Sequence, residues 1–234
     1  MNVSCGASTA GWTIYDTDRS VLMTCTGGTW VTTPVVLCGA ASSGSSASVD
    51  SPVAYGSLTD ARDGKTYKTV TIGGAEWMAE NLNFYESSDG TVKIDSSFCY
   101  DNLQSNCDVY GRLYQMFSVS DACPAGTHLP TTEEWTALRN ALRSEFHVTD
   151  ARDVAEAGDW ENGAGTNTSG FGALPGGFRQ KSGLFVSMSE GAYFWGYDST
   201  VASERSFALN DSYEFTMEPR IYVNASYSLR CVKN

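Results

Sequence analysis

The stretch GAASSGSSASVDSP, residues 39–52, constrains the fold of this chain more than any other feature. Its side chains are almost all small or polar, so it cannot bury enough apolar surface to fold. Segments of this composition act as flexible linkers between folded parts. We therefore predict a small module at residues 1–38, a linker at residues 39–57 and a main domain at residues 58–234.

The small module contains three short β-prone runs, VLMTC, GGTW and TTPVVLC, with turn signals around them. They predict a β-rich piece, which also carries Cys5, Cys25 and Cys38. In the main domain, KTYKTVTIGGAEW predicts a strand over residues 67–72, a Gly-Gly hairpin turn and a second strand that carries Trp77.

One stretch of the main domain is strongly helical. Thr131 and Glu134 form a Thr-x-x-Glu capping box directly after Pro130, which predicts a helix start. Four apolar side chains then recur on one helical face, at Trp135, Leu138, Leu142 and Phe146. We expect this stripe to pack in the core.

Charge and hydropathy limit the partners. The net charge of −12 and the pI of about 4.5 should repel phosphate backbones and anionic lipids, so we expect no nucleic-acid partner. No apolar run approaches the roughly 20 residues that cross a bilayer, so we expect no membrane insertion. The opening MNVSCGASTAGW has neither a basic start nor an apolar signal core, so we expect that a signal was removed or that the chain is a fragment.

The seven cysteines are widely spaced, with no CxxC pair, and only His128 and His147 accompany them. Zinc sites need close pairs of such ligands, so we expect no metal or other cofactor, and disulfides formed in an oxidising compartment instead. Cys99 and Cys107 are eight residues apart, close enough for a short local loop. The odd count leaves one thiol that is free, bonded to another molecule, or separated from a partner upstream.

The sequence offers little sign of catalysis. It has no Gly-x-Ser-x-Gly elbow, no P-loop and no dinucleotide fingerprint. We expect His128, beside Leu129 and Pro130, to make a structural hydrogen bond, and His147 to complement the negative end of the helix. Carboxylates are present, but no pair is singled out as the acid and base of a glycosidase.

A loop-rich stretch after the helix could supply oxygen ligands for calcium, at Asp159, Glu161, Asn162 and Asn167. Their spacing matches no EF-hand loop. Solvated turns are the favoured interpretation of this stretch, and calcium is the alternative.

Several long motifs carry a resemblance to a known family. DGKTYKTVTIGGAEWMAENLN, CYDN, NCDVYGRLYQM, CPAGTHLPTTEEW, GFGALPGGFR and YSLRCVKN occur in this order. Together they resemble the Fibrobacter succinogenes major paralogous domain over residues 58–234.

That domain is similar in turn to the formylglycine-generating enzyme (sulfatase-modifying factor) group, through HLPTTEEW and LRCVK. The resemblance implies an α+β, C-type-lectin-like fold, rich in loops, with small twisted antiparallel sheets and few helices. The enzymes use a close cysteine pair that binds copper, whereas here only Cys231 lies in that region, with Cys123 as its implied partner. The histidine set of the iron-dependent sulfoxide synthases is also missing, so we expect no enzyme and no catalytic residue.

The C-terminal clusters GYDST, NDSY and YVNASY resemble the diversified face of variable proteins of diversity-generating retroelements. Those proteins use the same lectin-like fold and randomise adenine-containing codons. Tyr, Ser and Asn also suit ordinary exposed strands and turns, so both origins stay open.

The N-terminal CGASTAGWTIYDTDRSVLMTCTGGTW resembles short Cys-Gly-Trp segments near the tips of type IV-like pilus adhesins. This resemblance implies attachment to a pilus or envelope through the N-terminal module. It pairs Cys5 with Cys25 and leaves Cys38 unpaired or bonded outside this chain.

The leading hypothesis is therefore a secreted or surface-displayed bacterial binding module, whose partner is a protein or glycan on another cell or surface. Residues 193–228 form the predicted binding face, with aromatic contact area and adaptable polar groups. The expected contacts are Trp195, Tyr197, Asp198, Ser203, Arg205, Tyr213, Glu214, Arg220, Tyr222 and Asn224, with a place in the core as the alternative for Trp195. The rival hypotheses are a formylglycine-generating-like oxidase and a structural envelope domain without a ligand.

Overall fold

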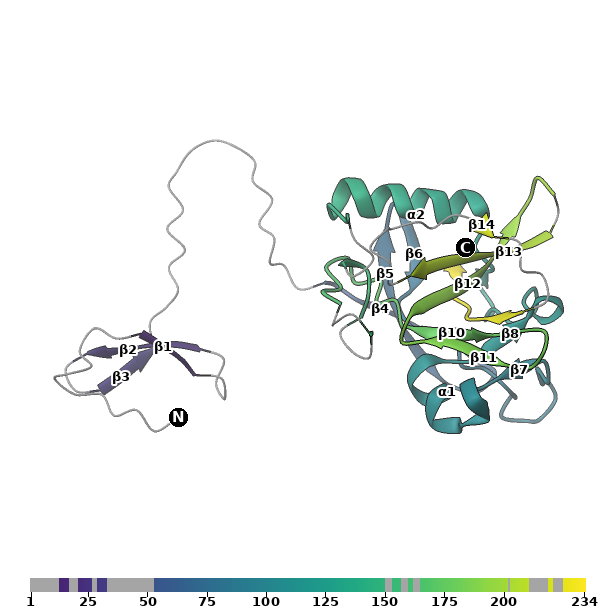
Figure 1. Cartoon of the computed structure of the whole chain (residues 1–234), viewed down its shortest axis with the longest axis horizontal. Coiled ribbons are helices and arrows are strands. Elements are labelled where there is room, and N and C mark those ends of the chain that lie inside the picture. Colours follow the sequence, from purple (N-terminus) through teal and green to yellow (C-terminus); the bar gives the residue numbers. More distant parts are fainter. Residues whose placement is uncertain are drawn as a thin grey trace. The chain divides into compact units, whose positions relative to one another are not determined.

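The structure is a computed structural model, and it divides into two compact units, Met1–Asp50 and Ser51–Asn234 (Figure 1). It describes residues 13–16, 21–26, 29–32, 53–149, 153–156, 160–161, 165–201, 203–210, 219–220 and 225–234. The division between the units falls inside the predicted linker.

The first unit contains a three-stranded antiparallel sheet with the order β1-β2-β3. Its strands are β1 (Thr13–Asp16), β2 (Val21–Thr26) and β3 (Thr29–Thr32). The expected β-rich character is confirmed. Cys5 and Cys38 lie outside the described residues and the side chain of Cys25 is not described, so the pairing of Cys5 with Cys25 stays a prediction.

The second unit contains a five-stranded sheet in which the end of the chain pairs with its beginning. The order is β4-β5-β6-β16-β9. The strands are β4 (Gly56–Thr59), β5 (Thr66–Ile72), β6 (Ala75–Met78), β9 (Thr127–His128) and β16 (Val232–Lys233). The predicted hairpin is confirmed: Gly73 and Gly74 connect β5 to β6 with φ of 60° and 81°, values that a two-residue primed turn requires.

A second sheet has the order β14-β13-β12-β10-β15-β8-β7, with β11 paired to β10. All its pairs are antiparallel except β10 with β12. The strands are β7 (Ser97–Phe98), β8 (Leu113–Gln115), β10 (Gly176–Arg179), β11 (Phe185–Met188), β12 (Gly191–Asp198), β13 (Ser203–Asn210), β14 (Pro219–Arg220) and β15 (Ser226–Tyr227).

Two α-helices occur in the described part of the chain, α1 (Gln104–Tyr110) and α2 (Thr132–Glu145), with short 3-10 turns at Tyr100–Asn102 and Met116–Ser118. The predicted helix is α2, and its capping box is confirmed, because Glu134 N donates to Thr131 Oγ1 at 3.1 Å and Thr131 N donates to Glu134 Oε2 at 2.8 Å. The predicted stripe is confirmed as well: three of its side chains are buried and Phe146 is half-buried against the core.

Helix α1 was not expected from the sequence. No side chain in the described part of the chain caps its N-terminus, and it ends at Gly111, whose φ of 73° suits glycine. With two α-helices in its described residues and small antiparallel and mixed sheets, the second unit is a loop-rich α+β fold, as predicted.

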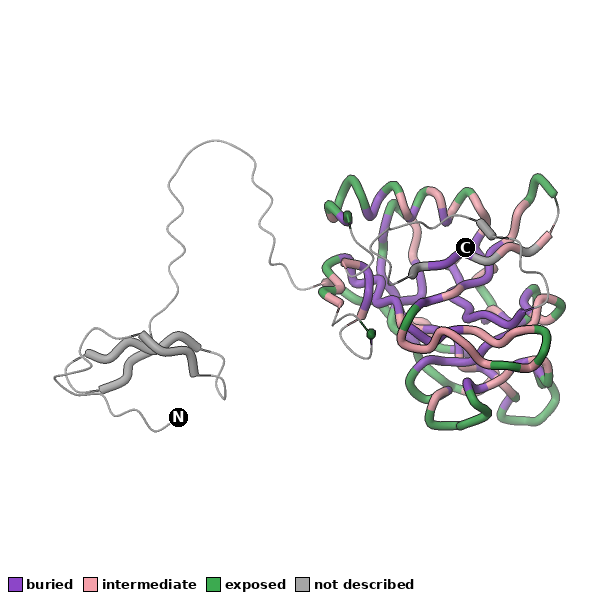
Figure 2. Tube along the Cα trace, viewed as in Figure 1, coloured by how far each residue is buried: buried purple, intermediate pink, exposed green. Residues whose placement is uncertain are grey.

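The core is built around Trp135 of α2, whose ring contacts rings from both sheets. Its centroid lies 4.9 Å from that of Trp77 on β6 and 5.2 Å from that of Phe207 on β13. Figure 2 shows the buried residues gathered where the strands and α2 meet. Large aromatic side chains bury about 150–250 Å² each, so this cluster contributes much of the apolar burial.

The folded unit begins earlier than expected. Val53 packs against the core, and β4 starts at Gly56, inside the stretch that composition assigned to the linker. The domain therefore begins before residue 58, its predicted start, because Val53 packs in the core and β4 pairs with β5.

Two predicted disulfides are confirmed. Cys99 is bonded to Cys107 with the Cα atoms 4.9 Å apart, and Cys123 to Cys231 with the Cα atoms 5.8 Å apart. The second bond connects the segment before β9 to the segment before β16, two neighbouring strands of the five-stranded sheet.

Candidate ligand-binding surface

The predicted binding face is built on a long hairpin. Strands β12 and β13 pair over their full length, from Gly191 opposite Asn210 to Asp198 opposite Ser203. Side chains alternate between the two faces of a strand. They form two sets: Phe194, Gly196, Asp198, Ser203, Arg205 and Phe207 on one face, and Tyr193, Trp195 and Tyr197 on the other.

The first face packs against α2. Phe194 and Phe207 stack on Trp135 with centroids 5.5 and 5.2 Å away. Gly196 allows this close approach, because a Cβ there would lie 2.5 Å from Phe207 and 2.7 Å from Trp135 Nε1. The base of the hairpin is therefore held tightly against the helix.

The second face is also covered at its base. Trp195 is only 1% exposed, its Nε1 donates to Tyr114 O at 2.7 Å, and its ring meets Tyr227 edge-on at 4.9 Å. The assignment of Trp195 to the binding surface was therefore wrong, and the alternative place in the core is correct. The physical reason is that core clusters cover both faces of β12, so alternation exposes neither face at this position.

The turn end of the hairpin carries a charged pair. Arg205 Nε lies 3.3 Å from Asp198 Oδ2, and Thr200 donates to Asp198 Oδ1 from its backbone N at 3.0 Å and from its hydroxyl at 2.6 Å. These interactions lower the pKa of Asp198. The hydrogen bond from the Thr200 hydroxyl has the largest effect, and Arg205 contributes a smaller one. A pair this close to solvent stabilises little, so its main effect is to orient the two side chains.

Hydrogen bonds fasten this end to the start of α2. Tyr197 N donates to Pro130 O at 2.8 Å, and the Thr132 hydroxyl donates to Tyr197 O at 3.4 Å. Ser199 Oγ also donates to Glu133 Oε1 at 3.4 Å. The chain between the two strands is thus attached to a rigid helix rather than to another loop.

The structure brings together Tyr197, Asp198, Ser203 and Arg205 at one end of the hairpin, all half-buried, with Tyr197 on the face opposite the other three. The backbone of Arg220 lies in β14, opposite Ser206, and its side chain is not described. Tyr213, Glu214, Tyr222 and Asn224 lie outside the described residues, so their roles stay predictions.

Sequence reasoning missed Thr200, which holds the Asp198 carboxylate through its hydroxyl and backbone N. The signal was present in GYDST, because an aspartate followed by serine or threonine favours an Asx turn. Ser199 and its partner Glu133 come from distant segments, and no local pattern could have paired them.

Comparison with known families decides the relationship of the chain. The model of the Fibrobacter succinogenes major domain matches residues 70–233. The chain belongs to this family. No curated protein and no solved structure matches the chain significantly.

In this Fibrobacter succinogenes major domain, the closing LRCVK motif serves the core. Arg230 is fully buried; its Nε donates to Asn81 Oδ1 at 2.8 Å, and its two terminal nitrogens donate to Phe171 O and Gly172 O. Burial lowers the pKa of Arg230 to about 9, mainly by removing water from the guanidinium. The motif therefore places a hydrogen-bonded guanidinium among aromatic rings, beside the disulfide-bonded Cys231.

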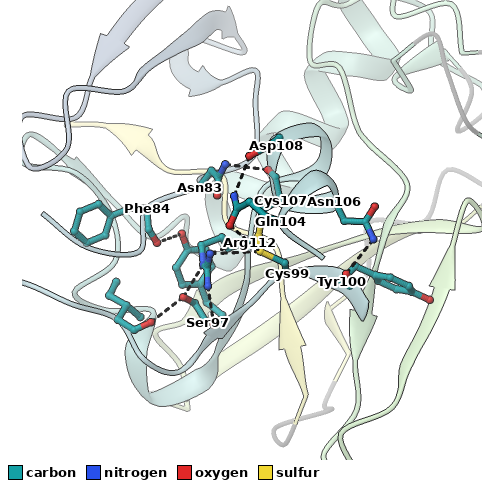
Figure 3. The surroundings of a disulfide bond; sticks show 12 residues. Asn83, Phe84, Ser97, Cys99, Tyr100, Gln104, Asn106, Cys107, Asp108 and Arg112 are labelled. Atoms are coloured by element: carbon teal, nitrogen blue, oxygen red, sulfur yellow. Dashed lines mark hydrogen bonds between the residues drawn. A yellow bond between two sulfur atoms is a disulfide. The ribbon is translucent and has the colours of Figure 1, made fainter. Parts of the chain in front are cut away.

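A second buried arginine lies against the other disulfide of the domain (Figure 3). Arg112 donates from Nε to Ser97 Oγ at 2.9 Å and from a terminal nitrogen to Ser97 O at 3.1 Å. Its other terminal nitrogen lies 3.5 Å from Cys99 Sγ and 3.6 Å from Cys107 Sγ. One buried side chain that follows the loop in sequence therefore contacts both cysteines that close it.

The structure tests the expectation for His128, and it describes only some of the residues of the calcium alternative. His128 lies 2.7 Å from Asn234 Oδ1 and 2.8 Å from Glu134 Oε1, so its expected hydrogen-bonding role is confirmed. The Asn167 amide bonds to Glu156, Tyr55 and the backbone of Gly172. Asp159 and Asn162 lie outside the described residues, and no group of three His, Cys, Asp or Glu side chains suited to a metal occurs in the part that is described.

Proposed function

We propose that this protein is a secreted or surface-displayed bacterial binding module, and that residues 193–228 recognise a protein or glycan on another cell or surface. The observation that carries the proposal is the β12–β13 hairpin. Its base is clamped between core clusters, while its turn end presents an oriented Asp198–Arg205 pair on one face and Tyr197 on the other.

A rigid base favours binding, because side chains that are already ordered lose less entropy when a ligand arrives. Tyr197 offers contact area, and Asp198 and Arg205 offer hydrogen bonds of both kinds. The Tyr, Ser and Asn residues that follow in the sequence would extend this surface.

The disulfides support the location outside the cell. Two disulfides fit a compartment that is oxidising. None of the helices in the described parts of the chain is long and apolar enough to cross a membrane. We propose attachment to a pilus or envelope through the first unit, on the strength of its adhesin-like sequence.

We further propose that the second unit has the C-type-lectin-like fold of the formylglycine-generating enzyme group. The packing of α2 under late strands that form the candidate face supports this proposal. Diversification by a retroelement is a separate proposal about the origin of the face. A nearby DNA repeat that differs from the C-terminal codons only at adenines would support it, and flanking DNA without such a repeat would contradict it.

The bonded state of Cys231 supports binding rather than oxidase chemistry, because a disulfide sulfur is no thiolate ligand for copper. Copper binding together with oxygen consumption in the presence of a thiol peptide would overturn the binding proposal in favour of the oxidase.

The direct test is to screen the full chain on arrays of bacterial surface proteins and of glycans at micromolar concentration. The variant Tyr213→Ala/Tyr222→Ala should weaken binding by more than about tenfold while the melting temperature changes by a few degrees at most. Phe117→Ala is the matched control, because this exposed aromatic lies outside residues 193–228 and should leave binding unchanged. The proposal is overturned if neither array yields a ligand, if the double variant binds as the native chain does, or if the double variant fails to fold.

A further inference from the structure

A small hollow lies between β5, the segment after β6 and helix α1, and no residue of the β12–β13 hairpin lines it. Its volume is about 220 Å³. Drug-sized ligands occupy pockets of about 300 Å³ or more, so this hollow suits a smaller guest. Its main polar and apolar groups are Lys65, Tyr67, Glu80, Asn83, Asp108 and Val109.

The walls of the hollow are fixed before any ligand arrives. The Cys99–Cys107 disulfide closes the loop that carries α1, and Asn83 Nδ2 donates to Cys107 O at 2.9 Å (Figure 3). Gly111 ends α1 where a Cβ would lie 2.7 Å from Asn81 Cβ, so helix and segment approach closely. A preformed cavity loses little entropy on binding.

A buried phenol provides a free donor in this hollow. Tyr67 is 5% exposed, and its oxygen accepts a bond from Asn83 N at 3.1 Å. Within the described residues, no group accepts its own O–H proton. Burial raises the pKa of Tyr67, so the phenol keeps that proton at neutral pH.

Free acceptors face the same space. Glu80 uses Oε2 for Lys68 N at 2.6 Å, and Asp108 uses Oδ1 for Gln104 Nε2 at 2.9 Å. The second oxygen of each carboxylate has no donor among the residues that the structure describes. The Asn83 side-chain oxygen adds a third acceptor, because its amide nitrogen is the group used for Cys107.

The charges around the hollow disfavour an anionic ligand. Two carboxylates, Glu80 and Asp108, would repel an anion. The ammonium of Lys65 is already paired with Asp63 at 3.3 Å and bonded to Asn83 O, so it does not offset these two carboxylates. A neutral ligand whose groups both donate and accept hydrogen bonds avoids this repulsion, and it can pair the Tyr67 donor as well as the acceptors, which a bare cation cannot do.

We propose that this hollow binds one ring of a neutral sugar without the help of a metal ion. Hydroxyl groups of the sugar donate to Glu80, Asp108 and Asn83, and one accepts from Tyr67. The C–H face of the ring packs against the exposed Val109 and the half-buried Leu174. This site is separate from the C-terminal face and does not depend on the function proposed for that face.

The test titrates the full chain with a panel of free neutral hexoses, pentoses and N-acetylhexosamines at millimolar concentration, with NMR detection of the Asn83 side-chain amide. At least one sugar should shift this signal and saturate. Tyr67→Phe removes only the O–H and should weaken that binding about tenfold, as expected for one buried hydrogen bond. Tyr85→Phe is the matched control, because this phenol bonds to Asp95 outside the hollow and its loss should leave sugar binding unchanged.

Asp108→Asn is the second variant and lies at an exposed position, so it should weaken binding even if Tyr67→Phe failed to fold. Addition of EDTA should change nothing. The proposal is overturned if no sugar of the panel shifts the Asn83 signal, if both variants bind as the native chain does, or if EDTA abolishes binding. Monosaccharide binding that survives Tyr213→Ala/Tyr222→Ala separates this site from the C-terminal face, and an oligosaccharide series shows whether the bound ring is free or the end of a glycan.

Discussion

Trp135 of α2 stacks on Phe207 of β13, with ring centroids 5.2 Å apart and an angle of 19° between the planes. The same indole lies 4.9 Å from Trp77, so one helical side chain connects the second sheet to the first. Its Nε1 is buried and has no hydrogen-bond partner among the residues that the structure describes. The packing of this ring therefore outweighs the cost of one unpaired donor, about 1–3 kcal/mol.

Trp135→Ala should lower the free energy of unfolding by about 3–5 kcal/mol, because it leaves a cavity where both sheets meet. Trp135→Phe should cost clearly less, since it keeps an aromatic ring in contact with Phe207 and leaves a smaller cavity. Urea unfolding of the full chain measures both values. Equal losses for the two variants would show that the phenyl ring kept in Trp135→Phe does not fill the space between the two sheets.

The two disulfides should differ in their contribution to stability. They close loops with sequence separations of 8 and 108 residues. Loop entropy assigns about 2–3 kcal/mol to the shorter loop and about 4–5 kcal/mol to the longer. Cys123→Ser should therefore destabilise the domain more than Cys99→Ser, as measured by urea unfolding under non-reducing conditions, and the reverse order would contradict the entropic account.

Local patterns predicted the local parts of this fold. The capping box of Thr131 and Glu134 fixed the start of α2, and the pair Gly73-Gly74 fixed the first hairpin, because both signals depend on neighbouring residues. The spacing of Cys99 and Cys107 indicated the short disulfide. The bond between Cys123 and Cys231 came from the family resemblance, since no local pattern joins such distant residues.

Features that depend on tertiary packing were missed. Trp195 was assigned to the surface because it lies in the C-terminal segment predicted as the binding face, yet both faces of β12 are covered at its base. Helix α1 was missed because its N-cap is Leu103, which is not a capping residue. The sugar-sized hollow gathers Tyr67, Glu80 and Asp108 from three separate segments, so only the folded chain reveals it.

Thr200→Val should raise the pKa of Asp198 more than Arg205→Gln does, because the Thr200 hydroxyl is the largest cause of its lowering. Carboxyl-carbon NMR titration of the full chain measures the shift in each variant. A larger effect of the arginine variant would mean that charge, rather than the hydrogen bond, holds the carboxylate.

The same pKa fixes the sign of a pH effect. Because the folded pKa of Asp198 is lowered, the ionised carboxylate stabilises the fold above its ordinary pKa of about 3.9. That contribution is lost as the pH falls below this value and through the folded pKa. The stability difference between the native chain and Thr200→Val should therefore be present at neutral pH and disappear in acid, and a difference that persists in acid would assign it to packing.

Arg112 lies beside the Cys99–Cys107 disulfide with its guanidinium 4.5 Å from the centre of the Tyr85 ring, and burial lowers its pKa. Arg112→Lys should destabilise the domain more than Arg112→Met, because the compact ammonium cannot reach Ser97 and both sulfurs together yet keeps a charge away from water. Burial would lower the folded pKa of the introduced lysine below its usual value of about 10.4, so the protonated form would weaken the fold. The stability of Arg112→Lys should therefore rise between about pH 7 and about pH 9.5, whereas that of Arg112→Met should follow the native chain. Urea unfolding at both pH values measures this, and a lysine variant as stable as the native chain at the lower pH would show that the site is open to water.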